Sequence, residues 1–227
     1  MMKMNRPAQG SDGKSKVLIV DDHPILRQGL GKLLNDQDDL QVCGEAETPP
    51  QAVRAVNELQ PDLVLLDLTL AEGDGLELCK QLHDMHPKLP ILVVSMHDES
   101  LYAERCLHAG AMGYVMKQEP PAKVVAAIRR VLGGDVYLSE PMAAKLLRGL
   151  SRTRAHDDRP PLERLTDREL QVFRLIGGGM SVREIAEKLF LSVKTIETHR
   201  EHIKEKLNLK SSSELLRYAV QYRVDTT

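Results

Sequence analysis

The sequence predicts a doubly wound α/β domain with a five-stranded parallel sheet, followed by a small all-α domain of four helices. Short apolar runs alternate with amphipathic segments across residues 16–135, as expected for five βα units in series. Four shorter helical segments, most with strong N-terminal caps, follow after residue 162. The length of 227 residues also exceeds that of a typical single domain, so we expect two.

The first half is expected to alternate strand and helix. The strands are Lys16–Val20, Leu40–Glu45, Leu63–Leu66, Ile91–Ser95 and Gly113–Met116. The helices are Pro24–Asn35, Gln51–Leu59, Leu76–Met85, Leu101–Ala109 and Pro121–Leu132. Most of the strands are short apolar runs, which is typical of strands buried on both faces of a sheet. Because no GxGxxG follows the first strand, a dinucleotide site is not expected.

Local signals mark the helices. The apolar side of the first is expected to comprise Ile25, Leu26, Leu30, Leu33 and Leu34. Pro49-Pro50 precedes the second helix, Pro87 ends the third and Gly110 ends the fourth. Gly133-Gly134 then ends the fifth.

The C-terminal part begins with a connection. Tyr137–Leu150 is expected to form an extended turn and a helix, and the charged residues 151–161 a linker. The following helices are Asp167–Ile176, Val182–Leu189, Val193–Leu207 and Ser212–Tyr222. Capping boxes mark three of their starts, since Thr166, Ser181 and Ser211 each precede a Glu by three residues. The tight turn between the second and third of these helices predicts a helix-turn-helix.

Composition points to a globular protein whose halves have different partners. Hydrophobic content is 42% and charged content 28%. Residues 1–150 carry 16 Lys and Arg against 21 Asp and Glu, whereas the remainder carries 15 against 12. Cys43, Cys79 and Cys106 lie far apart without CxxC spacing, so neither zinc nor a disulfide framework is expected. No apolar run suggests a membrane span or signal peptide, and a cytoplasmic location is expected.

Polar residues follow the strands of the predicted sheet. Asp21 and Asp22 end the first strand, Asp67 the third, Ser95 the fourth and Lys117 the fifth. Carboxyl ends of parallel strands share one edge, where such sheets place their ligands. Asp67 alone could be a turn aspartate, but a cluster of carboxylates persists only when cations pair with it. The pattern therefore predicts an acidic pocket that binds Mg²⁺.

The expected chemistry is phosphoryl transfer onto a carboxylate. Asp22, Asp67 and a backbone carbonyl just after it, that of Thr69, would bind the metal, with Asp21 acting through a metal-bound water. Lys117 would pair with the phosphoryl oxygens, and the Ser95 hydroxyl would bond one of them.

These residues, with Tyr114 before the lysine, resemble the receiver domain of two-component response regulators across residues 16–135. The resemblance implies a flavodoxin-like fold, phosphorylation of Asp67 by a sensor histidine kinase, and a switch formed by Ser95 and Tyr114. In that switch the hydroxyl moves toward the phosphoryl group and the ring turns inward behind it. The alternative for Tyr114, which we consider weaker, is a plain core aromatic. The sequence departs from many receivers at Leu70-Ala71-Glu72 and at Gln118, but no reacting group is lost.

A second resemblance covers residues 162–222. Leu165-Thr166-Asp167-Arg168-Glu169, Glu184-Ile185-Ala186, Lys194-Thr195-Ile196 and His199 are similar to the LuxR-type helix-turn-helix of NarL/FixJ regulators. It implies that Val193–Leu207 enters the major groove of double-stranded DNA. Bases would be read by Glu197, Thr198 and Glu201, and phosphates contacted by Lys194, Thr195, Arg200 and Lys204. A solvated charged surface is the alternative for this face, and His199 is expected to be a packing residue.

Together these features predict a response regulator that is not an enzyme beyond its own Mg²⁺-dependent phosphorylation and dephosphorylation. The expected parts are a disordered segment 1–15, a receiver 16–135, a connecting helix and linker 136–161, and a DNA-binding domain 162–227. Phosphorylation would release the DNA-binding domain, which would pair as a homodimer on a palindromic site. One alternative is a regulator that binds DNA without phosphorylation and uses its receiver only to dimerise. A haloacid-dehalogenase-type phosphatase is disfavoured, because Thr69 stands where it needs a second acid.

Overall fold

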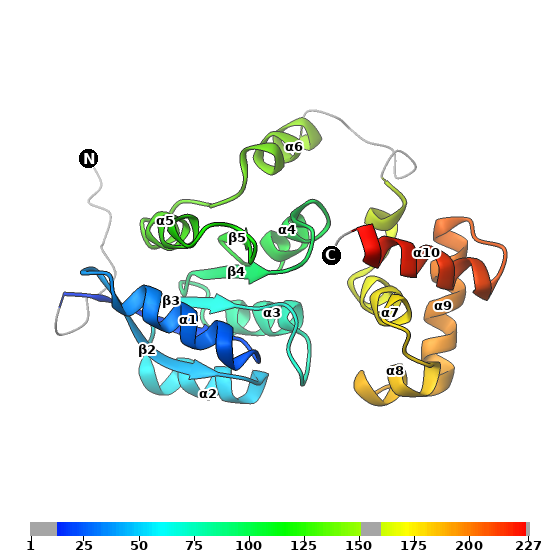
Figure 1. Ribbon diagram of the computed structural model, residues 1–227, viewed down its shortest axis with the longest axis horizontal. Helices are drawn as coiled ribbons and strands as arrows, with labels where there is room; N and C mark the ends of the chain where they lie inside the picture. The colour runs from blue at the N-terminus through cyan, green and yellow to red at the C-terminus, as the bar shows by residue number, and fades with distance from the viewer. Residues whose placement is uncertain (1–12, 151–159, 226–227) are drawn as a thin grey trace. The chain divides into compact units, whose positions relative to one another are not determined.

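The computed structural model describes residues 13–150 and 160–225. The chain divides into two compact units between Ala144 and Lys145, and each is described by itself (Figure 1). Most of the expected N-terminal segment 1–15 and most of the expected linker 151–161 lie outside the described residues.

The first unit contains a parallel sheet with strand order β2-β1-β3-β4-β5 (Figure 1). Its strands are β1 Ser15–Val20, β2 Leu40–Ala46, β3 Leu63–Leu66, β4 Ile91–Ser95 and β5 Gly113–Met116. The strand order reverses direction at β1, so the sheet is doubly wound, as predicted. Leu66 pairs with Val20 on one side and Val93 on the other, which places the ends of β1, β3 and β4 at one edge.

Helices cover both faces of this sheet. They are α1 Pro24–Asn35, α2 Pro49–Leu59, α3 Gly75–Met85, α4 Glu99–His108 and α5 Pro121–Leu132. One core joins α1 and α5 to the sheet through Val17, Ile19, Leu65, Leu34 and Ile128. The helices α2, α3 and α4 pack side by side on the other face. Because both faces are covered, the consecutive residues Val17–Val20 of β1 and Leu63–Leu66 of β3 are all buried, and this explains why both runs are uninterrupted and apolar.

The apolar side expected for α1 was wrong at its first residue. Ile25 is 87% exposed, and the buried face consists of Arg27, Leu30, Gly31 and Leu34. Leu30 and Leu34 set the orientation of the helix on the sheet. Ile25 lies five residues before Leu30, about 140° around the helix, so it faces solvent. An arginine therefore occupies a buried position that the apolar pattern did not indicate.

The chain returns to the sheet after α5. Tyr137 forms a parallel bridge with Gly113, its carbonyl accepts from Tyr114 N at 2.9 Å, and its N–H donates to the carbonyl of Met112 at 3.0 Å. Helix α6, Glu140–Leu150, follows, and the side chain of Met142 is buried. The first compact unit consequently extends past residue 135, as far as Ala144.

The second unit is helical. A 3-10 turn, η2 Pro161–Arg164, precedes α7 Asp167–Gly177, α8 Val182–Lys188, α9 Val193–Leu207 and α10 Ser212–Asp225. The core contains Phe173, Ile185, Ile196, Ile203 and Leu215. Helices α7 and α10 approach closely at Gly177, where an added Cβ would lie 2.5 Å from the carbonyl oxygen of Ala219. None of the described helices combines the length and apolar character needed to cross a membrane.

The expected capping boxes form at α7 and α8. At α10 only half of the third box forms. Glu214 N donates to the Ser211 hydroxyl, but the Glu214 carboxylate accepts from Lys210 N, one residue before the expected donor.

Candidate functional site

The strand ends bring the predicted acids and lysine together at one edge of the sheet. Lys117 Nζ lies 2.7 Å from Asp67 Oδ2 and 2.8 Å from Asp21 Oδ2. All three side chains are at most 5% exposed. Asp67 N also donates to the Val20 carbonyl at 2.8 Å. This bond fixes the start of the loop between β3 and α3, residues 67–74, against β1; we call it the acceptor loop. The lysine thus spans from the end of β5 to the ends of β3 and β1.

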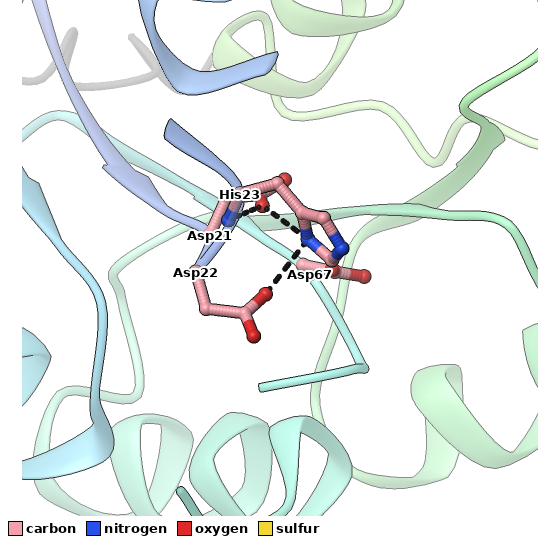
Figure 2. Close-up of side chains that lie close together, drawn as sticks. All are labelled: Asp21, Asp22, His23 and Asp67. Carbon is pink, nitrogen blue, oxygen red and sulfur yellow. Dashed lines mark hydrogen bonds and ion pairs between the residues drawn. The ribbon is translucent and has the colours of Figure 1, made fainter. Parts of the chain in front are cut away.

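The three carboxylates lie close together beside His23, which contacts Asp21 and Asp22, and they differ in how their oxygens are engaged (Figure 2). Asp21 is fully engaged, because Oδ1 accepts from His23 N at 2.8 Å and Oδ2 lies 2.8 Å from Lys117 Nζ. Asp67 Oδ1 is buried and has no hydrogen-bond partner. Asp22 Oδ1 is also buried without one, although His23 Nδ1 lies 2.8 Å away in poor hydrogen-bond geometry. Asp22 and Asp67 are therefore the two acids with an oxygen available for a further ligand.

Those free oxygens fit a hard cation. One ligand atom from each of Asp21, Asp22, His23 and Asp67 lies within 4.8 Å of the others. Mg²⁺ prefers carboxylate oxygens and retains water molecules beside them. Asp22 and Asp67 could bind such an ion directly, and Asp21, whose oxygens are occupied, could act through a water molecule.

The charge of the cluster is only partly compensated. Burial raises the pKa of Asp67 above its ordinary value, although the Lys117 ammonium and the backbone of Thr69 act in the opposite direction. One ammonium faces the carboxylates of both Asp21 and Asp67, so like charges remain close together. A bound cation would relieve this repulsion.

The expected switch pair lies beside this cluster. Ser95 is fully buried, and its hydroxyl accepts from His97 N at 3.3 Å. Tyr114 is 1% exposed and its hydroxyl donates to the His97 carbonyl at 2.8 Å, so the ring already points inward in this structure. The His97 ring packs against Tyr102 at a tilt of 35°, with ring centroids 5.0 Å apart, and His97 Nε2 lies 2.8 Å from Thr69 Oγ1. His97 thereby joins the acceptor loop to both expected switch residues.

A glycine shapes the acceptor loop. Gly75 is the first residue of α3, and an added Cβ would collide with the Asp67 carbonyl and lie 2.5 Å from Leu68 Cα. The preceding Asp74 caps α3 by accepting from Leu76 N at 2.8 Å. Since any side chain at position 75 would displace the loop that carries Asp67, this close approach requires glycine.

A second candidate site is the exposed face of α9 in the second unit. The exposed predicted DNA contacts are Lys194, Glu197, Thr198 and Glu201, whereas Thr195, Arg200 and Lys204 are half-buried. Ser192 caps the helix by accepting from Thr195 N at 3.0 Å. His199 is half-buried, and burial lowers the pKa of its imidazole despite the nearby carboxylate of Glu169. That environment suits a packing residue.

The predicted base-reading and phosphate-contacting residues pair with each other along α9. Arg200 donates to both carboxylate oxygens of Glu197, at 3.0 and 3.1 Å. Lys204 Nζ lies 2.9 Å from Glu201 Oε2. Both pairs are spaced by three residues, so they share a face of the helix. Glu197 is thus engaged through both carboxylate oxygens and Glu201 through one.

The sequence interpretation did not identify Arg27, His23, Gly75 or His97 as part of the first site. Gly75 could have been recognised as a glycine at the first turn of a helix after an Asp cap. Arg27 interrupts the 3-4 spacing of the buried face of α1, but this was visible only once Leu30 and Leu34 were known to face the sheet. The sequence carried no signal for His97.

Comparisons with known proteins agree with this arrangement. Residues 17–129 match the response regulator receiver domain, and residues 163–219 match the bacterial regulatory proteins of the luxR family. The oxygen regulatory protein NreC of Staphylococcus carnosus is 37% identical over 213 residues, which cover 92% of this chain and 98% of that protein. NreC of Staphylococcus haemolyticus is 35% identical with the same coverage.

Solved structures give the same picture. RcsB of Salmonella enterica serovar Typhimurium, bound to promoter rprA in the presence of the phosphomimetic BeF3-, is 28% identical with a TM-score of 0.69. The match covers 91% of this chain and 98% of that one. A LuxR-family two-component response regulator from Aurantimonas is 33% identical with a TM-score of 0.57, covering 61% of this chain and 99% of the other.

Proposed function

The chain belongs to the response regulators that join a receiver domain to a LuxR-type helix-turn-helix, and we propose that phosphorylation of Asp67 controls its DNA binding. The observation that carries the proposal is the asymmetry of Asp67. Its Oδ2 is held by Lys117 at 2.7 Å, whereas its buried Oδ1 is free. A buried carboxylate with one fixed and one available oxygen is arranged to act as a nucleophile.

The donor we propose is a phosphohistidine of a sensor histidine kinase. Asp67 Oδ1 would attack phosphorus, forming a P–O bond while the P–N bond breaks and its electron pair returns to the imidazole. Lys117 would then pair with a phosphoryl oxygen, and the Ser95 hydroxyl would donate to another. Mg²⁺ held by Asp22, the Thr69 carbonyl and the Asp67 oxygen that does not bond phosphorus would offset the negative charge of donor and acceptor when bound. The Lys117 contact already present keeps the acceptor side chain in place.

In the second unit, α9 would read double-stranded DNA through the major groove. Glu197 and Glu201 can accept from cytosine N4, and Thr198 can contact a thymine methyl. We propose that the ion pairs on α9 exchange on binding, so that Arg200 and Lys204 turn from Glu197 and Glu201 to phosphates. The acids of both pairs are about half exposed, and water and phosphate oxygens can replace their contacts with the cations. Lys194 and Thr195, near the start of the helix, complete the phosphate contacts.

Phosphorylation would release this helix and allow the second unit to pair as a homodimer on a palindromic site. Movement of Ser95 and Tyr114 would alter the surface of the receiver and shift the population toward the released form. The surface we propose for pairing is on α10, where Leu216 is 47% and Val220 41% exposed. Leu215 and Ala219 are buried in the unit itself and are not available. The cytoplasm, where kinase and chromosome are both reached, is the proposed location.

The alternative is DNA binding independent of phosphorylation, with the receiver serving only to dimerise. The free Asp67 Oδ1 favours the phosphorylated regulator. The two are separated by comparing DNA binding of the full chain before and after phosphoryl donor, and of residues 155–227 alone. Release predicts that the isolated piece binds a palindromic site better than the unphosphorylated full chain, whereas equal or weaker binding rejects it.

Phosphoacceptance is tested with acetyl phosphate and intact-mass measurement. The full chain should gain one phosphoryl group in Mg²⁺ and none in EDTA, and Asp67→Asn should gain none. Asp74→Asn is the matched control, because it changes a neighbouring acid while keeping an Asn able to cap α3. Equal uptake by Asp67→Asn and wild type would reject Asp67 as the acceptor.

A further inference from the structure

Arg27 is a buried cation next to the acidic cluster that the proposed reaction does not use. It lies on α1 and is 8% exposed. Its Nε donates to Glu45 Oε2 at 2.8 Å, and its two terminal nitrogens donate to the Asp21 carbonyl at 2.6 Å and to Glu47 Oε1 at 2.5 Å. The guanidinium therefore joins α1 to the ends of β1 and β2.

The contact with Asp21 involves the main chain and not the carboxylate. The positive charge of Arg27 is engaged by Glu45 and Glu47, whose side chains are 44% and 53% exposed. The carboxylates of the acidic cluster are thus left for other cations. A buried guanidinium is tolerated only when its donors are satisfied, and here three acceptors on two strand ends meet that need.

The bond from Arg27 to the Asp21 carbonyl holds the second of the two peptide groups that flank Asp21. Asp21 N donates to the Ala46 carbonyl of β2 at 3.0 Å, and the Asp21 carbonyl accepts from Arg27. The Asp21 carbonyl belongs to the peptide bond that leads to Asp22. Arg27 therefore holds the peptide group that precedes Asp22 and so orients the Asp22 side chain. The Oδ1 atom of that side chain is buried and has no hydrogen-bond partner.

We propose that Arg27 is a positioning residue for Mg²⁺, holding the Asp21-Asp22 turn so that Asp22 presents its buried Oδ1 beside Asp67. The inference rests on the proposed function, because it assigns Arg27 to the metal site of that reaction. Groups that orient metal ligands through hydrogen bonds typically change metal affinity by 10–100-fold when removed. Arg27 acts on the ligand backbone and never on the metal itself.

The test is a calorimetric titration of the full chain with Mg²⁺ alone, with no phosphoryl donor present. Arg27→Met should raise the dissociation constant roughly tenfold. Arg27→Lys should also raise it, because a single ammonium cannot reach three acceptors as the planar guanidinium does. At saturating Mg²⁺ both variants should be phosphorylated by acetyl phosphate at close to the wild-type rate. A purely structural role would not move metal affinity in this selective way.

Arg129→Met is the matched control. Arg129 also pairs with a carboxylate of this unit, donating to Asp39 at 2.7 and 2.8 Å. Asp39, however, precedes the N-terminal end of β2, whereas the acidic cluster lies at the C-terminal ends of the strands. That variant should keep the wild-type dissociation constant. Melting temperatures without Mg²⁺ report separately on folding, and Arg27→Lys carries the test if Arg27→Met does not fold.

Two outcomes are decisive and distinct. Folded Arg27 variants whose Mg²⁺ dissociation constants stay within twofold of wild type would overturn the role of Arg27, while leaving the proposed function intact. Failure of the wild-type chain itself to bind Mg²⁺ or to accept a phosphoryl group would instead reject the proposed function, and this inference with it.

Discussion

Glu169 and Lys206 form an ion pair that joins α7 to the last turn of α9, a contact called here the α7–α9 clamp. Lys206 Nζ lies 2.6 Å from Glu169 Oε2, and Thr166 N donates to the same oxygen at 2.7 Å. Glu169 thus completes the capping box of α7 and pairs with α9 at the same time. One carboxylate, 4% exposed, thus joins α7 to α9.

This clamp predicts a loss of stability in acid. Burial alone would raise the pKa of Glu169, but Lys206 and the Thr166 backbone outweigh it and hold the pKa below the ordinary 4.5. A carboxyl with a depressed folded pKa adds stability above its ordinary pKa, and that stability disappears as the pH falls through the folded value. We expect Glu169→Gln to destabilise the second unit by about 1 kcal/mol at pH 7 and to flatten its pH dependence below 4.5.

Calorimetric melting of the full chain between pH 3 and 7 measures both effects. Glu184→Gln is the control, since Glu184 occupies the equivalent position in the capping box of α8 but is exposed. Glu184→Gln should lower the stability of the second unit less than Glu169→Gln does. Identical pH profiles for wild type and Glu169→Gln would contradict the assignment of this clamp.

Gly75→Ala should impair phosphorylation without unfolding the chain. The new Cβ would collide with the Asp67 carbonyl and displace the acceptor loop. Since misplacement of reacting groups by about 1 Å can cost 10²-fold in rate, we expect a loss of roughly tenfold or more with acetyl phosphate. Intact-mass time courses provide the measurement.

Gly29→Ala serves as the control for that substitution, because nothing lies within 4 Å of its added Cβ on α1. This variant should react at the wild-type rate and gain about 0.5–1 kcal/mol of stability. A Gly75→Ala variant that reacted as fast as Gly29→Ala would show that the loop tolerates a side chain there.

On α9, Lys194 and Glu197 should have separable effects on DNA binding. Lys194→Ala should weaken binding to all sequences alike and reduce the slope of log affinity against log salt by about 1. Glu197→Ala should leave that slope largely unchanged and relax the preference for particular bases. Selection from a randomised-site library followed by salt titration measures both. If Glu197→Ala kept the base preference of the wild type, Glu197 would not be a base-reading residue.

The exposed apolar residues of α10 should govern pairing. Leu216→Ala combined with Val220→Ala should weaken the dimer of the phosphorylated chain at least tenfold, because each truncation removes apolar surface that pairing would bury. Ser213→Ala, also exposed on α10, should not. Sedimentation equilibrium gives the dissociation constant. An unchanged dissociation constant in the double variant would indicate that the receiver, and not α10, forms the dimer.

Most of the secondary structure followed from local sequence. Uninterrupted apolar runs predicted the buried strands, and hydroxyl and glycine signals placed the helix starts and ends within a few residues. The helix boundaries of α1, α5 and α9 agree with the prediction. Errors arose where a side chain's surroundings depend on distant segments. Ile25 looked like part of an apolar face, but the packing of Leu30 and Leu34 turned it to solvent.

The sequence by itself determined the fold class, the family and the identity of the acids at the strand ends, because parallel strands must place their carboxyl ends at one edge. Only the tertiary structure decided how those groups share their bonds. It engages both oxygens of Asp21, leaves one buried oxygen of Asp22 and one of Asp67 without a hydrogen bond, and bonds Arg27 to the Asp21 carbonyl. Such assignments depend on distances between residues from different strands and helices. Local propensity and spacing contain no information about them, since each side chain's partner is set by how the helices pack on the sheet.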